Sequence, residues 1–362
     1  MPKVSVVVPV RDAEPHLDQC LGSIAAQTLP ADDIELIVVD DSRNAGLDQA
    51  TGEYVFFLDP RDWLAPTALE ALVGIADRTG SGVVLPRTEI VESDRPRTAP
   101  GPSQTAAAVD VVASRVYRTY STEKLYRSAL LRDHNLRFPS AGPADPFTLE
   151  AYFLSPHVSV AGDQPYCFVR WREDNSLADL GPGNCLTNNT LLIELIEKYC
   201  HAKERRIPLL QGPVLGSTGV AALFGPRFLV QFEPDEQRDV FDHAHALLRR
   251  VWKPAYRREG TLGMHVLSSL VWQGDFDAVV EVSWMIRNKA PLPVLPADGR
   301  HRPTFVASTG TRVKDALTKD ELAPYVQAQR ERRKAAERRR RRLAMLAHPA
   351  RLVQQFAGRR HA

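Results

Sequence analysis

Short apolar runs alternate with segments of helical periodicity through the first half of the chain. Residues 4–8, 34–39 and 54–58 are dominated by apolar β-branched or aromatic side chains, which is typical of strands buried on both faces of a sheet. Residues 14–27 and 65–78 instead repeat their apolar positions at helical spacing. The alternation predicts an α/β fold with a mostly parallel sheet flanked by helices.

Shorter elements complete this region. We predict helices near residues 127–134 and 147–154, and strands at 83–85, 158–161 and 167–171. Residues 93–103 are rich in proline and serine, so we predict an exposed loop there.

From residue 181 the apolar periodicity becomes helical, with predicted helices at 187–201, 236–251, 261–273 and 275–287. Changes in composition then divide the chain into four parts. We predict an α/β domain at 1–180, an α-helical lobe at 181–290, a Pro-rich linker at 291–324 and a basic helical tail at 325–362.

The net charge of +2 hides an uneven distribution. Residues 330–342 (RERRKAAERRRRR) contain nine Lys or Arg and two Glu, which leaves the rest of the chain mildly acidic. This segment and the apolar residues that follow predict either contact with an anionic membrane through residues 330–356 or a solvated tail. Nucleic acid is disfavoured as a partner because no aromatic residues interleave with the arginines.

Cysteine usage and hydropathy indicate the compartment. Cys20, Cys167, Cys185 and Cys200 are scattered without a C-x-x-C pair, which argues against disulfides and zinc and fits a reducing cytosol. The sequence has no run of about 18 apolar residues, so we predict no membrane-spanning helix. The apolar run within residues 1–10 is too short for a signal peptide. We predict a cytoplasmic protein, with the tail offering peripheral attachment at the inner face of the cell membrane.

Several segments are informative through their order. VSVVVPV (4–10), IELIVVDD (34–41), RNAG (43–46) and TGEYVFFLDPRDW (51–63) together resemble family 2 glycosyltransferases of the GT-A (Rossmann-like) fold. EKLYRSALLRDHNLRF (123–138), DPFTLEAY (145–152) and RWREDNS (170–176) resemble later motifs of the same family. The helical lobe and basic tail bear a weaker resemblance to bacterial members that build or glycosylate cell-surface polymers such as teichoic acids.

The resemblance implies a hexosyl transfer from a nucleotide-diphosphate sugar to a hydroxyl of a cell-surface polymer or lipid-linked acceptor. The alternative is a non-catalytic relative that binds anionic membrane or polymer through its tail. The resemblance also implies that Pro9 and Arg11 line the nucleotide pocket and that Asp40 and Asp41 contact the nucleotide. The alternative is that Asp40 and Asp41 are a pair of strand-end carboxylates that cap the next helix, and the context favours the binding role.

The resemblance places a divalent cation, Mg²⁺ or Mn²⁺, on Asp59 and Asp62. Arg61 stands between them where the family has an Asp, and a guanidinium cannot ligate a metal but can bind phosphate oxygens. Three interpretations stay open: Asp59 and Asp62 hold the metal alone, Arg61 substitutes in part, or the metal is lost.

The resemblance assigns Asp145 as the general base that deprotonates the acceptor, with Ala144 in place of the family's Glu. An N-cap ahead of Pro146 explains Asp145 equally well. Arg170 and Arg172 are implied ligands of the diphosphate, or else charged residues on a solvated strand face.

One junction departs from the family. Ser42 alone separates VVDD from RNAG, where about 30–40 residues form a helix and a strand in the resembling family. We expect the sheet to lose one strand and some apolar burial, which the chain tolerates only if residues 42–46 cap a helix directly, and the pocket to be open on one side. The chain is then a degenerate enzyme kept for binding, a truncated product, or an active enzyme with a rebuilt pocket.

Overall fold

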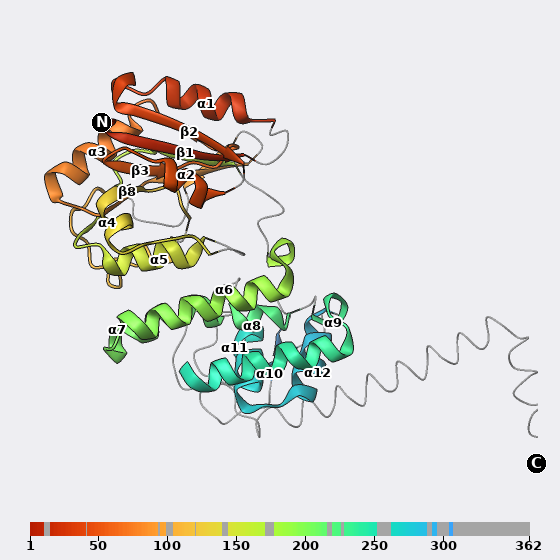
Figure 1. Ribbon diagram of the computed structural model, residues 1–362. Coiled ribbons are helices and arrows are strands. Elements are labelled where there is room, and N and C mark those ends of the chain that lie inside the picture. The colour runs from red at the N-terminus through yellow and green to blue at the C-terminus, as the bar shows by residue number, and fades with distance from the viewer. Residues whose placement is uncertain are drawn as a thin grey trace, which may run out of the picture. The chain divides into compact units, whose positions relative to one another are not determined.

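Figure 1 shows the computed structural model, which describes residues 1–10, 15–40, 42–92, 95–98, 104–119, 121–139, 144–170, 177–215, 219–225, 228–251, 262–287, 292–294 and 304–306. The chain divides into two compact units, Met1–Pro213 and Val214–Ala362.

The first unit is built on a six-stranded sheet with the order β2-β1-β3-β8-β5-β9. Its strands are β1 (Val4–Val10), β2 (Ile34–Asp40), β3 (Tyr54–Phe57), β5 (Val83–Pro86), β8 (Leu125–Arg127) and β9 (Val158–Ala161). The pairs β1–β2, β1–β3 and β5–β9 are parallel, and only β8 among these strands runs antiparallel to its neighbours. The prediction of a mostly parallel sheet is confirmed.

Helices cover both faces of this sheet (Figure 1). On one face, α1 (Leu17–Ala25) and α3 (Ala68–Thr79) bury their apolar stripes against Val6 and Phe56. The other face carries an aromatic cluster in which Phe57 meets Phe147 of α5 (Asp145–Leu154) edge to face at 5.9 Å. Such edge-to-face pairs add to the apolar burial that holds the layers together.

The one-residue junction leads directly into a capped helix. Ser42 is the N-cap of α2 (Arg43–Gln49), and its hydroxyl accepts a hydrogen bond from the Ala45 amide at 3.2 Å. Gly46 lets α2 approach β1 closely, because a Cβ at that position would collide with the Val7 side chain.

The shortened segment leaves β2 at the edge of the sheet. Leu36 and Val38 on one face of this strand are 44% and 49% exposed, whereas Ile37 and Val39 on the other face are buried. The prediction that residues 34–39 are buried on both faces is therefore wrong. The expected loss of apolar burial falls on these two side chains.

A second, four-stranded sheet in the same unit has the order β4-β10-β6-β7. It consists of β4 (Trp63–Leu64), β10 (Cys167–Arg170), β6 (Thr88–Glu92) and β7 (Arg95–Thr98). The loop predicted at residues 93–103 is thus wrong at 95–98, where antiparallel pairing with β6 satisfies the backbone. Pro96 is tolerated because β7 is an edge strand.

Helices α4 (Ser128–Asp133), α6 (Leu177–Tyr199) and α7 (Lys203–Leu215) complete this part of the chain. Helix α6 begins ten residues before the predicted start at 187, so Gly181, Pro182 and Gly183 lie within its first turns. The boundary predicted at residue 180 consequently falls inside a helix. Helix α6 packs against α5 further along, where Asn188, Lys198 and Tyr199 contact Asp145 and Glu150.

The described residues of the second unit are mainly helical. It contains α8 (Val220–Leu223), α9 (Phe228–Gln231), α10 (Pro234–Val251), α11 (Leu262–Gln273) and α12 (Phe276–Arg287), and a strand pair β11 (Leu292–Val294) and β12 (Thr304–Val306) within the predicted linker. Among the described helices, none combines the length and apolar composition that crossing a membrane requires. The basic tail lies outside the described residues.

Candidate active site

Three parallel strands end together at one edge of the large sheet. Asp40 is in register with Val10 at the end of β1, and the Leu58 amide donates a hydrogen bond to the Val7 carbonyl at 3.0 Å, so Asp59 follows beside Pro9. Asp40 and Asp59 are thus separated by β1, roughly 10 Å at the usual strand spacing. Ligands of such sheets bind beyond this edge. The predicted site residues Arg11 and Asp41 lie outside the described residues.

The loop after β3 folds around the carboxylate of Asp59. One oxygen, Oδ1, accepts hydrogen bonds from the Arg61 amide at 3.1 Å and from Arg61 Nε at 3.2 Å. The Asp59 carbonyl accepts a further bond from the Asp62 amide at 2.9 Å. The negative charge of Asp59 is therefore paired with a guanidinium from its own loop.

Asp62 joins this loop to the second sheet. Its side chain is buried, with 1% of the residue exposed, and Oδ1 accepts a hydrogen bond from the Arg170 amide at 2.9 Å. The Arg170 guanidinium lies 5.1 Å from the centroid of the Trp63 ring, a cation–π distance, and donates to Gln19 of α1 at 2.7 Å. The structure thus brings Asp59, Arg61, Asp62 and Arg170 together. Arg172 lies outside the described residues.

The pKa of Cys20 reflects the negative charges of this loop. Its thiol lies 3.6 Å from the Asp59 carbonyl oxygen, a sulfur hydrogen bond. Burial raises the pKa of Cys20 to about 12, and the charges of Asp62 and Asp59 raise it further in the same direction. Both carboxylates therefore act on the same thiol, which stays protonated and is no nucleophile at neutral pH.

The carboxylates of this loop do not fit a divalent cation. Mg²⁺ and Mn²⁺ need several oxygen ligands, whereas Asp59 is paired with Arg61 and Asp62 is buried against the backbone of β10. Across the described residues, no group of three or more His, Cys, Asp and Glu side chains is placed to hold a metal ion. The predicted pair Asp59 and Asp62 is brought together, but with a cation already beside it.

Asp145 lies in a second cluster of the same unit. It is the first residue of α5, and the N-cap is Ala144 with no side-chain hydrogen bond. Asn188 of α6 donates from Nδ2 to Asp145 Oδ2 at 3.3 Å. Burial raises the pKa of Asp145 to about 6, against the opposing effects of the Asn188 hydrogen bond and the Lys124 charge.

Lys124 and Asn188 are members of this cluster that sequence reasoning missed. Lys124 is buried, its Nζ donates to the Ser121 carbonyl, and burial lowers its pKa to about 8. Asn188 Oδ1 is buried without a hydrogen-bond partner among the described residues. Lys124 belongs to the family-like segment 123–138 and could have been considered from it, whereas nothing in the sequence marks Asn188.

The buried thiol of Cys167 is affected by charges from both the loop 59–62 and the Asp145 cluster. Burial raises the pKa of Cys167 on β10, and the charge of Asp62 raises it further while the charge of Lys124 opposes. Asp62 and Lys124 therefore both lie within electrostatic reach of Cys167.

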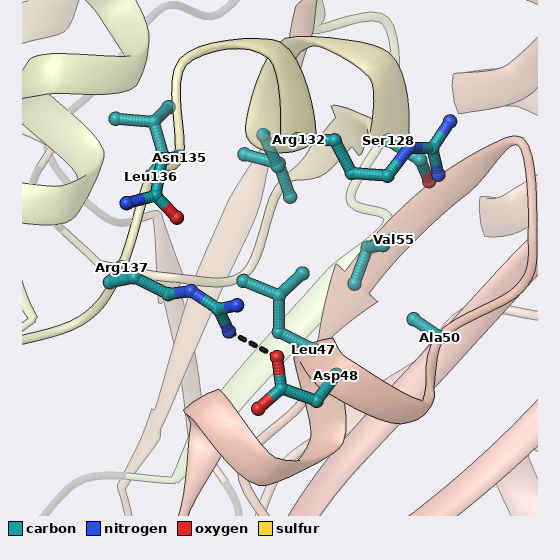
Figure 2. Close-up of a pocket in the computed structure, with 10 residues that line it drawn as sticks. Leu47, Asp48, Ala50, Val55, Ser128, Arg132, Asn135, Leu136 and Arg137 are labelled. Atoms are coloured by element: carbon teal, nitrogen blue, oxygen red, sulfur yellow. Dashed lines mark hydrogen bonds and ion pairs between the residues drawn. The ribbon is translucent and has the colours of Figure 1, made fainter.

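A separate pocket of about 270 Å³ lies between α2, β3 and α4 (Figure 2). Its lining includes Leu47, Val55 and Arg132, and the Arg137 guanidinium is directed at Asp48 in an ion pair. None of the predicted site residues lines it, so the strand-end edge remains the candidate active site.

Comparison with known proteins identifies the class of this fold. Residues 42–134 match the family model Glycosyl transferase family 2. The chain is 29% identical over 216 residues to the poly(ribitol-phosphate) beta-N-acetylglucosaminyltransferase TarS of Staphylococcus aureus, covering 49% of this chain and 37% of that protein. It is 26% identical over 249 residues to the poly(ribitol-phosphate) beta-glucosyltransferase of Bacillus spizizenii, covering 58% of this chain and 39% of that protein.

Solved structures agree on the fold. The crystal structure of S. aureus TarS 1-349 in complex with UDP superposes with a TM-score of 0.66 at 21% identity, covering 87% of this chain and 99% of that one. The complex of the same segment with UDP-GlcNAc gives a TM-score of 0.65 at 20% identity, with the same coverage. The chain therefore spans less than half the length of the two curated relatives named above, but nearly all of this crystallised TarS segment.

Proposed function

This chain carries a family 2 glycosyltransferase domain of the GT-A fold, and we propose that it transfers a sugar from a nucleotide-diphosphate sugar to a hydroxyl of a cell-surface polymer or lipid-linked acceptor. The observation that carries the proposal is the strand-end edge, where Asp59, Arg61, Asp62 and Arg170 gather beside the end of β1. A sheet edge with fixed charges of both signs suits a ligand that pairs a polar base with a diphosphate.

The donor binds across the ends of β1 and β2 in this proposal. Pro9 and Arg11 line the nucleotide, Asp40 and Asp41 accept hydrogen bonds from it, and Arg170 and Arg172 face the diphosphate. The complexes of the similar TarS segment with UDP and UDP-GlcNAc support a uridine nucleotide as the donor.

Asp145 is the proposed general base. With a pKa of about 6, roughly nine-tenths of its carboxyls are ionised at pH 7, so it is ready to accept a proton. It removes the proton of the acceptor hydroxyl while that oxygen attacks the anomeric carbon. The bond to the nucleoside diphosphate breaks on the opposite side, which inverts the anomeric configuration.

The leaving diphosphate needs positive charge. In the resembling family a divalent cation supplies it, but the carboxylates of Asp59 and Asp62 do not fit one in this chain. Here Arg61 occupies the centre of that carboxylate pair. Arg61 and Arg170 are the described cations at this loop that can take the same part.

The acceptor is proposed from the relatives. The proteins from S. aureus and B. spizizenii carry names of enzymes that glycosylate poly(ribitol phosphate), which supports a polyol-phosphate polymer as the acceptor class. A polyanionic acceptor also suits a chain whose residues 330–342 are strongly basic.

Calorimetric titration tests the donor half of the proposal. UDP, GDP and CDP are titrated separately into the full chain, each with Mn²⁺ and with EDTA. We expect saturable binding of UDP with a Kd between about 1 μM and 1 mM, the range of ordinary enzyme–substrate affinities. If none of the three nucleotides binds under either condition, the proposal fails.

The basic run favours a second candidate, a non-catalytic role at anionic membrane or polymer. Four buried free cysteines support a reducing, cytoplasmic compartment, from which the tail would reach the inner face of the membrane. Binding to vesicles of anionic lipid that weakens with salt and disappears when residues 326–362 are removed would support this role. Salt-independent binding would reject it.

A further inference from the structure

We infer that Arg61 takes the place of a divalent cation on the donor diphosphate, so that this chain binds its donor without metal. The inference rests on the proposed function, because it assumes a nucleotide-diphosphate sugar as the donor. It concerns a single side chain and the chemistry of the four-residue loop 59–62.

The first argument is the geometry of the Asp59–Arg61 pair. The Arg61 amide and Arg61 Nε both donate to Asp59 Oδ1, at 3.1 and 3.2 Å, so the carboxylate fixes the direction of the guanidinium. The Arg61 side chain is 32% exposed and the Asp59 side chain only 12%. An anion that approaches the loop therefore meets the guanidinium before the carboxylate.

The second argument is the state of the two carboxylates. A cation between Asp59 and Asp62 would have to displace the guanidinium from Asp59 or bind beside its positive charge. It would also have to reach Asp62, which is only 1% exposed and whose Oδ1 already accepts a hydrogen bond from the Arg170 amide. Both features oppose metal binding, whereas a phosphate can bind Arg61 without displacing the guanidinium or reaching Asp62.

The third argument is the chemistry of the guanidinium. Its planar fork matches two phosphate oxygens, and it stays protonated at any physiological pH. Arg170 at the end of β10 adds a second guanidinium beside the loop, held over Trp63 and hydrogen-bonded to Gln19. A diphosphate would thus meet two oriented cations.

Metal dependence of nucleotide binding tests the inference. UDP is titrated into the full chain by calorimetry, in EDTA and in Mn²⁺. We expect Kd values that agree within about twofold. We expect Arg61→Gln to weaken UDP binding by about tenfold or more in both conditions, since a charge-assisted bidentate contact is lost. Arg132→Gln, which removes an exposed arginine of α4, is the matched control and should leave the Kd unchanged.

A reciprocal variant makes the test sharper. Arg61→Asp removes the guanidinium and places three carboxylates within residues 59–62, which is an oxygen-rich donor set for Mn²⁺. We expect this variant to bind UDP in Mn²⁺ and to lose binding in EDTA. Arg61→Lys keeps the charge without the fork and should be intermediate between wild type and Arg61→Gln.

The outcomes separate the inference from the proposed function. Wild-type binding of UDP only in Mn²⁺ overturns the inference and leaves the proposed function standing. Metal-independent binding that Arg61→Gln and Arg61→Lys leave unchanged also overturns it. A folded wild type that binds no nucleotide overturns both. Circular dichroism of each variant identifies loss of fold, and the wild-type comparison of EDTA with Mn²⁺ decides the matter if a variant does not fold.

Discussion

Asn188 Nδ2 lies 3.3 Å from Asp145 Oδ2, and this hydrogen bond joins α6 to the first residue of α5. The bond favours the ionised carboxylate and so lowers the pKa of Asp145, against the burial that raises it. Asn188 is thus placed as a positioning residue for the proposed base, although it lies 43 residues away in sequence.

We predict that Asn188→Ala raises the pKa of Asp145 further and shifts the acidic limb of the pH dependence of kcat/KM to higher pH. The physical reason is the loss of a hydrogen bond to the charged form. Asn189→Ala is the matched control, because Asn189 is also buried on α6 but donates within its helix to the Cys185 carbonyl. An acidic limb that moves equally in both variants would contradict the assignment.

The buried carboxylate of Asp145 should destabilise the folded state at neutral pH. Its folded pKa of about 6 lies above the ordinary value, so the protein is most stable with respect to this group below about pH 4, where the carboxyl is protonated, and loses that stability as pH rises through 6. We predict that Asp145→Asn raises the free energy of unfolding by about 1–3 kcal/mol at pH 8 and by less at pH 5. Urea unfolding at the two pH values measures this. A destabilising Asp145→Asn at pH 8 would show that the carboxylate is not buried at a cost.

The edge strand β2 offers a test of the shortened segment. Leu36→Ser should change the free energy of unfolding by about 0.5 kcal/mol or less, because the side chain is already exposed. Ile37→Ala, at the next position on the buried face, should cost about 2–4 kcal/mol. If Leu36→Ser costs as much as Ile37→Ala, the outer face of β2 is covered in solution.

Continuous apolar runs predicted the strands β1, β2, β3, β5, β9 and β10, whereas β4, β6 and β7 were not predicted. The sequence could not predict that β2 is an edge strand, since an apolar run looks the same with or without a neighbour. The start of α6 was missed because Gly181, Pro182 and Gly183 indicate a break by their low helix propensity, whereas the helix runs through them. β8 was missed because three residues carry too little periodicity.

The candidate site likewise contains residues that the sequence predicted and residues that it did not. Asp59, Asp62 and Arg170 were predicted from motifs, and the structure brings them together at one loop. Lys124 and Asn188 escaped prediction because their importance comes from burial beside Asp145, a contact between segments far apart in the chain. Burial of a polar group is a property of the packed fold, and residue order alone does not encode it in a readable pattern.

The most direct measurement of the central claim is sugar transfer by the full chain and by Asp145→Asn. Radiolabelled UDP-N-acetylglucosamine and UDP-glucose are incubated separately with poly(ribitol phosphate), and label in the polymer is counted. We predict incorporation by the wild type from one of the two donors, and a loss of at least about 100-fold in Asp145→Asn with UDP affinity unchanged, as removal of a general base requires. Absence of transfer by a wild type that binds UDP, or equal transfer by Asp145→Asn, would contradict the account.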